Sequence, residues 1–243
     1  MPPKKFTLCV FTLDEIDSIQ VIMPQIDRSL FTQILVVDAG STDGTIAWCR
    51  QQGYEVLVQK NSGIRQAYQE AQPHFRGDYV ITFSPDGNSL PKKLPELIAK
   101  MQEGYDMVIV SRYRDGAKSE DDDRITAFGN WMFTQVTNVL HGGHYTDALV
   151  MFRGFRRDLI PRLKLDREDD PILVWPERLC FARIGVELLM SARASRAGFR
   201  VGEIPGDEPK RIGGERKMRV IRWGSALLLQ LLMEVFLPRS AYH

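Results

Sequence analysis

The chain has 243 residues, of which 44% are hydrophobic and 26% are charged, a balance typical of a soluble chain that buries one substantial core. Its 32 lysine and arginine residues nearly cancel its 31 aspartate and glutamate residues, so the formal net charge of +1 gives no reason to expect nucleic acid as a partner. The three cysteines lack the spacing of a metal site, which fits a reducing compartment. We see neither a signal peptide nor the roughly 18 uninterrupted apolar residues of a membrane span. We therefore expect a cytoplasmic protein.

Short apolar runs alternate with stretches of helical periodicity in the first half of the chain. The pattern predicts strands at 6–13, 33–39, 54–59, 78–84 and 106–111 and helices at about 15–30, 44–52, 64–72 and 91–103. Runs rich in Val, Ile and Phe indicate strands that are buried on both faces, and their alternation with helices indicates an α/β fold with a mostly parallel sheet. Ligands of such sheets bind beyond the carboxyl ends of the strands.

An aspartate stands at the end of the second predicted strand, where Asp38 begins the segment Asp-Ala-Gly-Ser-Thr-Asp-Gly. A carboxylate there is costly to bury without a partner, and a ligand with hydrogen-bond donors, such as a nucleobase, would be one. The alternative is a capped turn, because Gly40 permits left-handed backbone and Ser41, Thr42 or Asp43 can cap the next helix.

A second polar loop follows the fourth predicted strand, with the sequence Ser84-Pro-Asp-Gly-Asn88. Asp86 and Asn88 bring oxygen atoms within reach of a hard cation or a sugar hydroxyl. Pro-Asp-Gly-Asn is also a common turn sequence. Two acidic loops at the same edge of one sheet favour a binding site over two turns.

These motifs together resemble family 2 glycosyltransferases of the GT-A fold. Over about the first 115 residues, the segments that match the family in order and spacing are Thr12–Glu15, Val37–Thr45, Asn61–Gly63, Ser84–Asn88 and Ser111–Tyr113. The later parts that resemble the branch acting on polyprenyl phosphates, the dolichyl-phosphate mannosyltransferase-like enzymes, are Gly129–Asn130, Asp147–Arg153, Glu187 with Arg193–Pro205, and Arg211–Lys217. The resemblance implies an inverting enzyme that moves a sugar from a nucleotide donor to a polyprenyl phosphate.

The resemblance also implies which residues hold the donor. The base and ribose would be surrounded by the first two loops through Thr12, Leu13, Glu15 and Asp38. Asp38 would accept a hydrogen bond from the base. Arg211 and Lys217 flank a pair of glycines in a loop that closes over the diphosphate in the family, so this pair would neutralise the leaving group.

The family loop after the fourth strand normally carries an Asp-any-Asp pair that binds Mg²⁺ or Mn²⁺ at the diphosphate. Ser84 stands at the first aspartate here, and Asn88 stands where the family has glutamine. A hydroxyl is an uncharged and poorer ligand, so we expect Asp86 and Asn88 to hold the metal with reduced affinity.

The acceptor site follows from the chemistry of a lipid phosphate, which is already an anion near neutral pH and needs cations rather than a carboxylate base. Arg112 and Arg124 match positions where the lipid-phosphate branch has arginine, and together with Asp86 they form the expected catalytic set. The alternative for Arg124 is a surface charge that pairs with the acidic run 120–123, which we interpret as a solvated loop.

Two other functions stay open at this stage. A hydroxyl acceptor on a growing polysaccharide would require a carboxylate near the anomeric carbon, for which Asp147 and Glu187 are the candidates. A non-catalytic nucleotide-sugar-binding subunit is suggested by Ser84. The sequence His141-Gly-Gly-His144 is more typical of a helix end than of a metal site.

We divide the chain into a catalytic domain and a C-terminal segment, at 1–215 and 216–243, and the catalytic domain into a nucleotide half at about 1–115 and an acceptor half at 116–215.

The C-terminal segment joins a basic stretch, 216–222, to a mostly apolar one, 223–237, that Gln230 and Glu234 interrupt. An amphipathic helix in the headgroup layer is one interpretation, and a helix buried against the core or in a dimer is the other. A lipid acceptor would then be reached by peripheral attachment at the inner face of the membrane, or through a membrane-protein partner or a homo-oligomer.

Overall fold

The computed structural model describes residues 4–212, 220–238 and 242. Its helices and strands, in chain order, are β1 (Phe6–Thr12), α1 (Ile16–Ile22), β2 (Gln33–Asp38), α2 (Thr45–Gln51), β3 (Glu55–Val58), α3 (Ile64–Ala71), β4 (Tyr79–Phe83), α4 (Leu94–Gln102), β5 (Met107–Ser111), α5 (Arg124–His141), β6 (Arg153–Arg156), α6 (Leu159–Arg162), α7 (Pro171–Cys180), α8 (Glu187–Arg196), β7 (Val201–Pro205) and α9 (Val220–Val235).

Every strand and helix predicted for the first half is present, with one error of length. The helix expected at 15–30 ends at Ile22, and a 3₁₀ turn, Met23–Gln25, follows it. Pro24 explains the early end, because proline has no N–H with which to continue the helical hydrogen bonds.

Seven strands form one sheet in the order β3-β2-β1-β4-β6-β5-β7. Among the described strands, β6 alone runs antiparallel to its neighbours, β4 and β5, so the expectation of a mostly parallel sheet is confirmed. The expectation that all the strands are buried on both faces is wrong for β3, which lies at the edge and is partly exposed. Because β1, β2, β4, β5 and β7 share one direction, the loops that follow them gather at one edge of the sheet.

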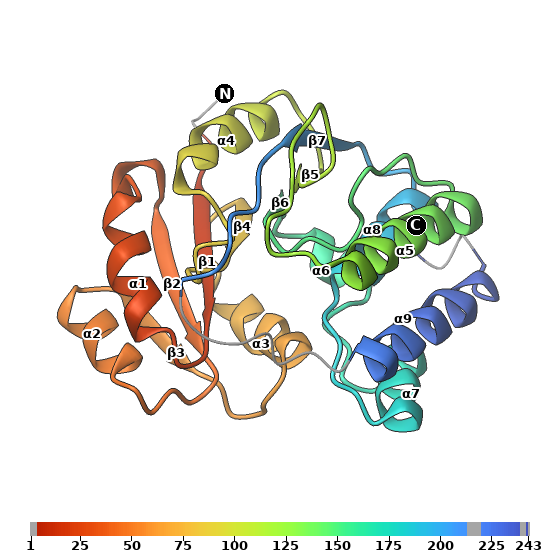
Figure 1. Ribbon diagram of the computed structural model, residues 1–243, viewed down its shortest axis with the longest axis horizontal. Coiled ribbons are helices and arrows are strands. Elements are labelled where there is room, and N and C mark those ends of the chain that lie inside the picture. The colour runs from red at the N-terminus through yellow and green to blue at the C-terminus, as the bar shows by residue number, and fades with distance from the viewer. Residues whose placement is uncertain (1–3, 213–219, 239–241, 243) are drawn as a thin grey trace.

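Helices cover both faces of the sheet (Figure 1). Side chains of α1, α2 and α4, among them Ile19, Cys49 and Leu97, form the core on one face. The core on the other face is built by α3 and by the helices from α5 onward, with Tyr68 and Leu189 among its buried side chains. The two cores hold the sheet rigid beneath the loops at its carboxyl edge.

The predicted C-terminal helix is present as α9, which packs against α7 and α5. Gln230 and Glu234 of this helix are buried. Within the described ranges, the helices are all too short or too polar to cross a bilayer.

Candidate active site

Asp38 at the end of β2 lies in the interior, and both of its carboxylate oxygens accept hydrogen bonds. Oδ2 accepts from Thr12 Oγ1 at 2.7 Å and from Ser41 Oγ at 2.6 Å, and Oδ1 accepts from the backbone N–H groups of Gly40 and Ser41 at 2.8 and 2.7 Å. These donors offset the cost of burying the charge. Gly40 adopts a φ of 93°, as the predicted turn requires. Asp38 therefore braces the loops after β1 and β2.

Two further aspartates tie the same loops together. Asp43 accepts from the N–H of Thr45 in its own loop and from the N–H of Ile16 at the start of α1, each at 2.9 Å. In the other direction, Asp14 accepts from the N–H of Thr42 at 2.8 Å. The second aspartate of the segment thus orders the start of α2, and the loop pair is rigid before any ligand binds.

A cavity of about 520 Å³ lies beside this loop pair. Among the residues predicted to bind the nucleotide-sugar donor, Thr12 and Leu13 line this cavity, and Glu15 lines a smaller hollow next to it. Asp38 is buried and lines neither hollow. The remaining walls of the cavity come from Phe11, Val37, Ala39, Gln59, Ser62, Gly63, Ile64, Ala67, Arg183 and Trp223. A pocket with apolar walls and a few polar atoms at the ends of parallel strands suits a nucleobase and its ribose.

Asp86, after β4, lies next to Arg211. The distance from Arg211 Nη1 to Asp86 Oδ2 is 3.9 Å, and Arg211 Nη2 donates to Asp121 Oδ2 at 3.1 Å. Asn88 Nδ2 also donates to Asp121, at 3.2 Å, and the N–H of Ile212 donates to the backbone carbonyl of Asp86 at 2.7 Å. Burial alone would lower the pKa of Arg211, but the hydrogen bond to Asp121 and the charge of Asp86 outweigh it and raise that pKa. Arg211 thus brings a positive charge to the carboxylates of this loop.

The side chains around Asp86 fit a divalent cation that takes part of its coordination from a ligand. Asn88 Oδ1 is buried and has no hydrogen-bond partner among the described residues, and it is an amide oxygen of the kind that hard cations bind. In the same parts of the chain, no group of three or more His, Cys, Asp or Glu side chains is placed to hold a metal. The described residues therefore offer too few ligands by themselves, and a diphosphate would have to supply the others. Lys217, the second predicted diphosphate ligand, lies outside the described residues.

Arg112 follows β5 and is buried among carboxylates. Asp147 accepts from its Nε at 2.6 Å and from its Nη2 at 3.0 Å, and Glu208 Oε2 lies 3.3 Å from Nη1. Asp122 is 3.9 Å from the same nitrogen. Burial would lower the pKa of Arg112, but Asp147 and Glu208 hold it well above its usual value. Arg112 is thus a fixed cation in a definite orientation.

A groove of about 310 Å³ opens beside Arg112, between α5 and α9. Its polar lining includes Arg112, Arg211, Glu208 and Asn130, and its apolar lining consists of Ile125, Phe133, Leu149, Val150, Met151, Trp223 and Leu227. Arg124, the other predicted phosphate ligand, is exposed at the first residue of α5 and is not part of this lining. Trp223 lines both the groove and the 520 Å³ cavity. The two hollows are therefore neighbours.

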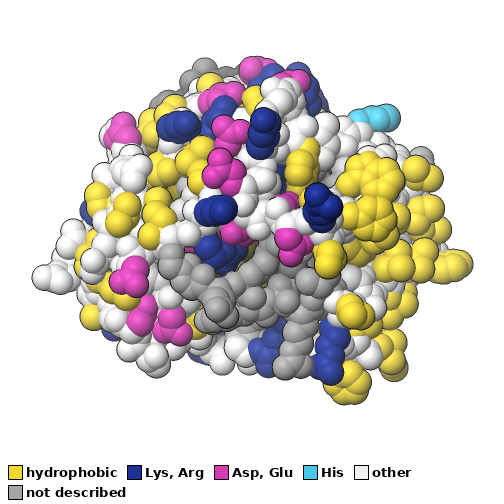
Figure 2. Space-filling model, in the orientation of Figure 1, with side chains coloured by type: hydrophobic (Ala, Val, Ile, Leu, Met, Phe, Trp, Pro, Cys, Tyr) yellow, Lys and Arg dark blue, Asp and Glu magenta, His cyan; other side chains and the backbone are white. Residues whose placement is uncertain are grey.

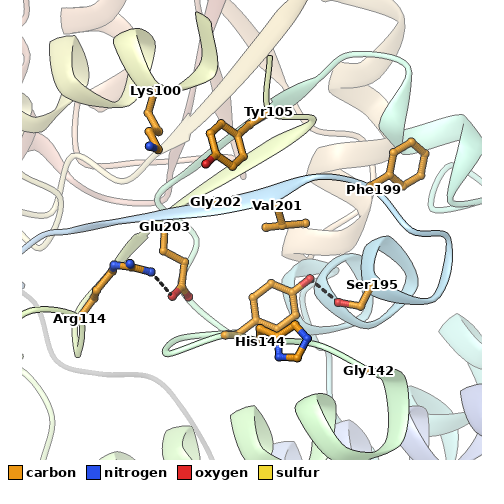
Figure 3. A pocket seen from close by; sticks show the side chains of 11 residues that line it. Lys100, Tyr105, Arg114, Gly142, His144, Ser195, Phe199, Val201, Gly202 and Glu203 are labelled. Carbon is orange, nitrogen blue, oxygen red and sulfur yellow. Dashed lines mark hydrogen bonds and ion pairs between the residues drawn. The ribbon is translucent and has the colours of Figure 1, made fainter. Parts of the chain in front are cut away.

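A polar pocket of about 310 Å³ lies at β7, and Glu203 is among its lining residues (Figure 3). Glu203 accepts hydrogen bonds there from the N–H groups of Thr146 and Asp147, at 2.9 and 3.2 Å, and pairs with Arg114 at 3.4 Å. Glu203 positions the segment that carries Asp147, and Asp147 in turn orients Arg112. The pocket is thus linked to the site through Glu203, which holds the backbone of Thr146 and Asp147.

The two candidates for the carboxylate base that a hydroxyl acceptor would require do not line the groove or the 520 Å³ cavity. Asp147 is fully buried and pairs with Arg112. Glu187, at the start of α8, lies in the core, where burial raises its pKa.

Sequence reasoning missed several residues of the site. The interpretation of 120–123 as a solvated loop is wrong for Asp121 and Asp122, which pair with Arg211 and Arg112. Four acidic residues that directly precede a helix start could have signalled cation partners. No local pattern marks Glu208 or Trp223. The helix-end interpretation of the glycines is confirmed, because α5 ends at His141 and Gly142 follows it at a φ of 73°.

Comparisons with known proteins agree with this geometry. The relatives include glycosyltransferase AglJ of Haloferax volcanii, with 27% identity over 236 residues that cover 94% of this chain and 72% of the relative. A dolichyl-phosphate hexose transferase of the same organism is 27% identical over 218 residues, covering 89% and 87%. The undecaprenyl-phosphate 4-deoxy-4-formamido-L-arabinose transferase of Klebsiella pneumoniae is 26% identical over 233 residues, and the match spans 91% of this chain but 64% of that protein.

A solved structure shares the fold. Glucosyl-3-phosphoglycerate synthase from Mycobacterium tuberculosis, in complex with Mn²⁺, UDP and phosphoglyceric acid, superposes with a TM-score of 0.71 at 20% identity, over 97% of this chain and 80% of that one. The same synthase has also been crystallised with Mg²⁺ and UDP. The likeness agrees with the GT-A fold expected from the sequence. The sequence profile described as glycosyl transferase family 2 matches residues 18–163, more than half of the chain, and the protein therefore belongs to this family of glycosyltransferases.

Proposed function

We propose that the protein transfers a sugar, with inversion, from a nucleotide-sugar donor to a polyprenyl phosphate. The observation that carries this proposal is the groove between α5 and α9, which is apolar along most of its wall and has Arg112 and Arg211 in its lining. An isoprenoid chain requires an apolar wall, and its phosphate requires cations. Relatives named for dolichyl-phosphate and undecaprenyl-phosphate transfer support the same class of acceptor.

The donor binds in the neighbouring cavity. Thr12 and Leu13 contact the base and ribose, Asp38 holds their loop, and Glu15 borders the same region. The diphosphate lies between Asp86 and Arg211, with Lys217 as a second cation. Trp223 separates the base from the acceptor groove, so both substrates are oriented by one side chain.

Asp86 and Asn88 would hold Mg²⁺ or Mn²⁺ together with the diphosphate. When it is bound, the cation neutralises charge on the leaving nucleoside diphosphate. Asp121 and Arg211 set the charge around it, because Arg211 lies within ion-pair distance of both Asp86 and Asp121. Ser84 supplies a hydroxyl in place of a carboxylate, so metal affinity is low without donor.

In the transfer step, a phosphate oxygen of the lipid attacks the anomeric carbon from the face opposite the diphosphate. The new carbon–oxygen bond forms as the bond to the diphosphate breaks, and the nucleoside diphosphate leaves with that electron pair. The attacking oxygen carries no proton, so the step needs no carboxylate base. Arg112, which Asp147 and Glu208 keep in one orientation, directs the phosphate, and Arg124 assists from the start of α5.

The reaction takes place at the inner face of the membrane, where a polyprenyl phosphate and a cytosolic nucleotide sugar can meet. The test is a transfer assay in detergent with labelled UDP- and GDP-sugars, polyprenyl phosphates, and Mg²⁺, Mn²⁺ or chelator. Labelled product in the organic phase is the expected result. Donor binding without a lipid product under every condition would contradict the proposal and favour a hydroxyl acceptor or a non-catalytic subunit.

A further inference from the structure

The C-terminal helix α9 has an unusual orientation for a surface helix. Its polar residues Gln230 and Glu234 are 0% exposed, whereas Ile221 and Phe236, at the first turn and just beyond the last, are 84% and 87% exposed. A surface helix normally presents polar side chains to water and apolar ones to the core. On α9, part of this pattern is reversed.

Buried ion pairs explain what holds the polar residues inside. Glu234 Oε2 accepts from Arg193 Nε at 2.9 Å, and Oε1 lies 3.7 Å from Arg196 Nε. Arg193 also pairs with Asp170 at 2.8 Å, and the hydroxyl of Tyr242 donates to Glu234. Without these partners Glu234 would be a buried, unpaired charge, so the network stabilises the orientation in which this side of α9 faces the core.

The outward face of α9 continues onto two helices that it contacts, α5 and α7. We call the exposed apolar side chains of these helices, together with Phe236 just beyond α9, the outer apolar face; its members include Ile125, Phe128, Trp131, Trp175, Leu179, Ile221, Leu228, Leu232 and Phe236. Figure 2 shows hydrophobic side chains gathered on this side of the molecule, at the right, apart from the charged centre. Contiguous apolar surfaces of this kind mark sites of association.

The charges of the three helices point to the kind of partner. Their sequences contain two carboxylates, Glu177 and Glu234, and both are turned inward in ion pairs with Arg65 and Arg193. Cations on the same helices, Arg124, Arg178 and Arg222, are exposed. The outward side of α5, α7 and α9 thus combines apolar and positively charged side chains, which is the composition of helices that lie in an anionic membrane interface.

We propose that the outer apolar face docks onto the surface of a bilayer that contains anionic lipids. Docking rests on the proposed function in one respect: the acceptor groove lies between α5 and α9, so a lipid that enters it from the bilayer must approach along this face. Exposed apolar side chains enter the headgroup layer, and Arg178 and Arg222 contact the lipid phosphates. Docking then brings the groove to the depth at which the acceptor resides.

The test uses vesicles without any polyprenyl phosphate, so that it measures docking and not acceptor binding. The purified chain is co-sedimented with vesicles of phosphatidylcholine alone and with added phosphatidylglycerol. We expect binding to the anionic vesicles that weakens as salt increases. The double variant Ile221→Ser with Phe236→Ser should bind at least about tenfold more weakly, because two large side chains no longer enter the interface.

The matched control is Val21→Ser on α1, where Val21 is exposed on a helix outside the face and its replacement should leave binding unchanged. The variant Arg178→Gln with Arg222→Gln should lose the preference for anionic vesicles but retain its thermal unfolding midpoint. All the substituted side chains are exposed, so we expect every variant to fold. Thermal unfolding curves check this.

Wild-type chain that ignores both kinds of vesicle, or that binds equally well after the Ile221 and Phe236 substitutions, would overturn the proposal. A dimer in solution that the same substitutions dissociate would show that a second copy covers the face, which also overturns it. Transfer to a polyprenyl phosphate in detergent tests the proposed function separately. If the chain transfers sugar in detergent but does not bind vesicles, the docking proposal is wrong and the proposed function is supported. If it binds vesicles but transfers no sugar, the proposed function is wrong and the docking proposal is supported.

Discussion

Asp147 holds the guanidinium of Arg112 by two hydrogen bonds, of 2.6 Å to Nε and 3.0 Å to Nη2, in a place where Asp147 is fully buried. The pair turns a flexible side chain into a fixed cation at the edge of the acceptor groove. Removing one partner of this pair should destabilise the protein more than removing one partner of a surface ion pair, because a buried charge without its partner is strongly destabilising.

We therefore expect Asp147→Asn to reduce the free energy of unfolding by about 3–5 kcal/mol, since Arg112 would keep its charge with less compensation. Asp115→Asn is the matched control, because Asp115 pairs with Arg114 in an exposed position, and its replacement should cost at most about 1 kcal/mol. Urea unfolding measures both. Equal losses in the two variants would contradict the structural role of the buried pair.

Arg211 is expected to contribute to donor binding, since its guanidinium lies beside Asp86 and Asp121. Losing charged hydrogen bonds of about 1.5–3 kcal/mol in Arg211→Ala should raise the Kd for a nucleoside diphosphate roughly ten- to hundredfold. Calorimetric titration measures it, with Lys210→Ala, an exposed neighbour, as the control. A Kd that changes equally in both variants would indicate a general effect of charge.

Ser84→Asp should increase the affinity for Mn²⁺, because it restores a second carboxylate beside Asp86. Manganese titration in the presence of a nucleoside diphosphate should show a gain of about tenfold over the wild type, which corresponds to roughly 1.4 kcal/mol. Ser89→Asp, in the same loop, is the comparison. Transfer that appears only in Ser84→Asp, with none in the wild type, would instead indicate that the natural chain is a non-catalytic subunit.

Arg124→Ala should leave donor binding unchanged and lower kcat/KM for the lipid acceptor roughly ten- to hundredfold, as expected if one charged contact to phosphate is lost. Arg50→Ala, an exposed arginine on α2, controls for the loss of a surface charge. The measurement is transfer in detergent at varied acceptor concentration. Full activity of Arg124→Ala would remove Arg124 from the acceptor site.

His141 should make the protein less stable in acid. It is buried at the end of α5, and burial together with the charge of Arg196 lowers its pKa to about 4. Between the unfolded pKa of about 6.5 and the folded pKa, only the unfolded chain binds the proton, so stability falls as pH falls.

This linkage corresponds to about 2 kcal/mol between pH 7.5 and pH 5. Urea unfolding at the two pH values should show the loss in the wild type and in His144→Leu, whose histidine is exposed, but a smaller loss in His141→Leu. The same pH dependence in His141→Leu would mean that other groups are responsible.

Local patterns in the sequence determined the order of strands and helices in the first half of the chain and placed Asp38, Asp86 and Arg112 at strand ends. This works because strand and helix periods depend on neighbouring residues, and because parallel strands present their carboxyl ends at one edge. The presence of Ser84 in place of the family's first metal-binding aspartate is also visible in the sequence by itself. The early end of α1 was missed although Pro24 marks it.

Only the tertiary structure decided which charges meet. Asp121 and Arg211, which form an ion pair, are 90 positions apart in the sequence, and Glu234 and Arg193 are 41 positions apart. The hydrophobic pattern of α9 predicted a helix but not which side faces the core, because that choice depends on the free energy of burying Glu234 against a cation from another helix. The groove, the wall that Trp223 contributes to two hollows, and the outer apolar face all follow from this packing.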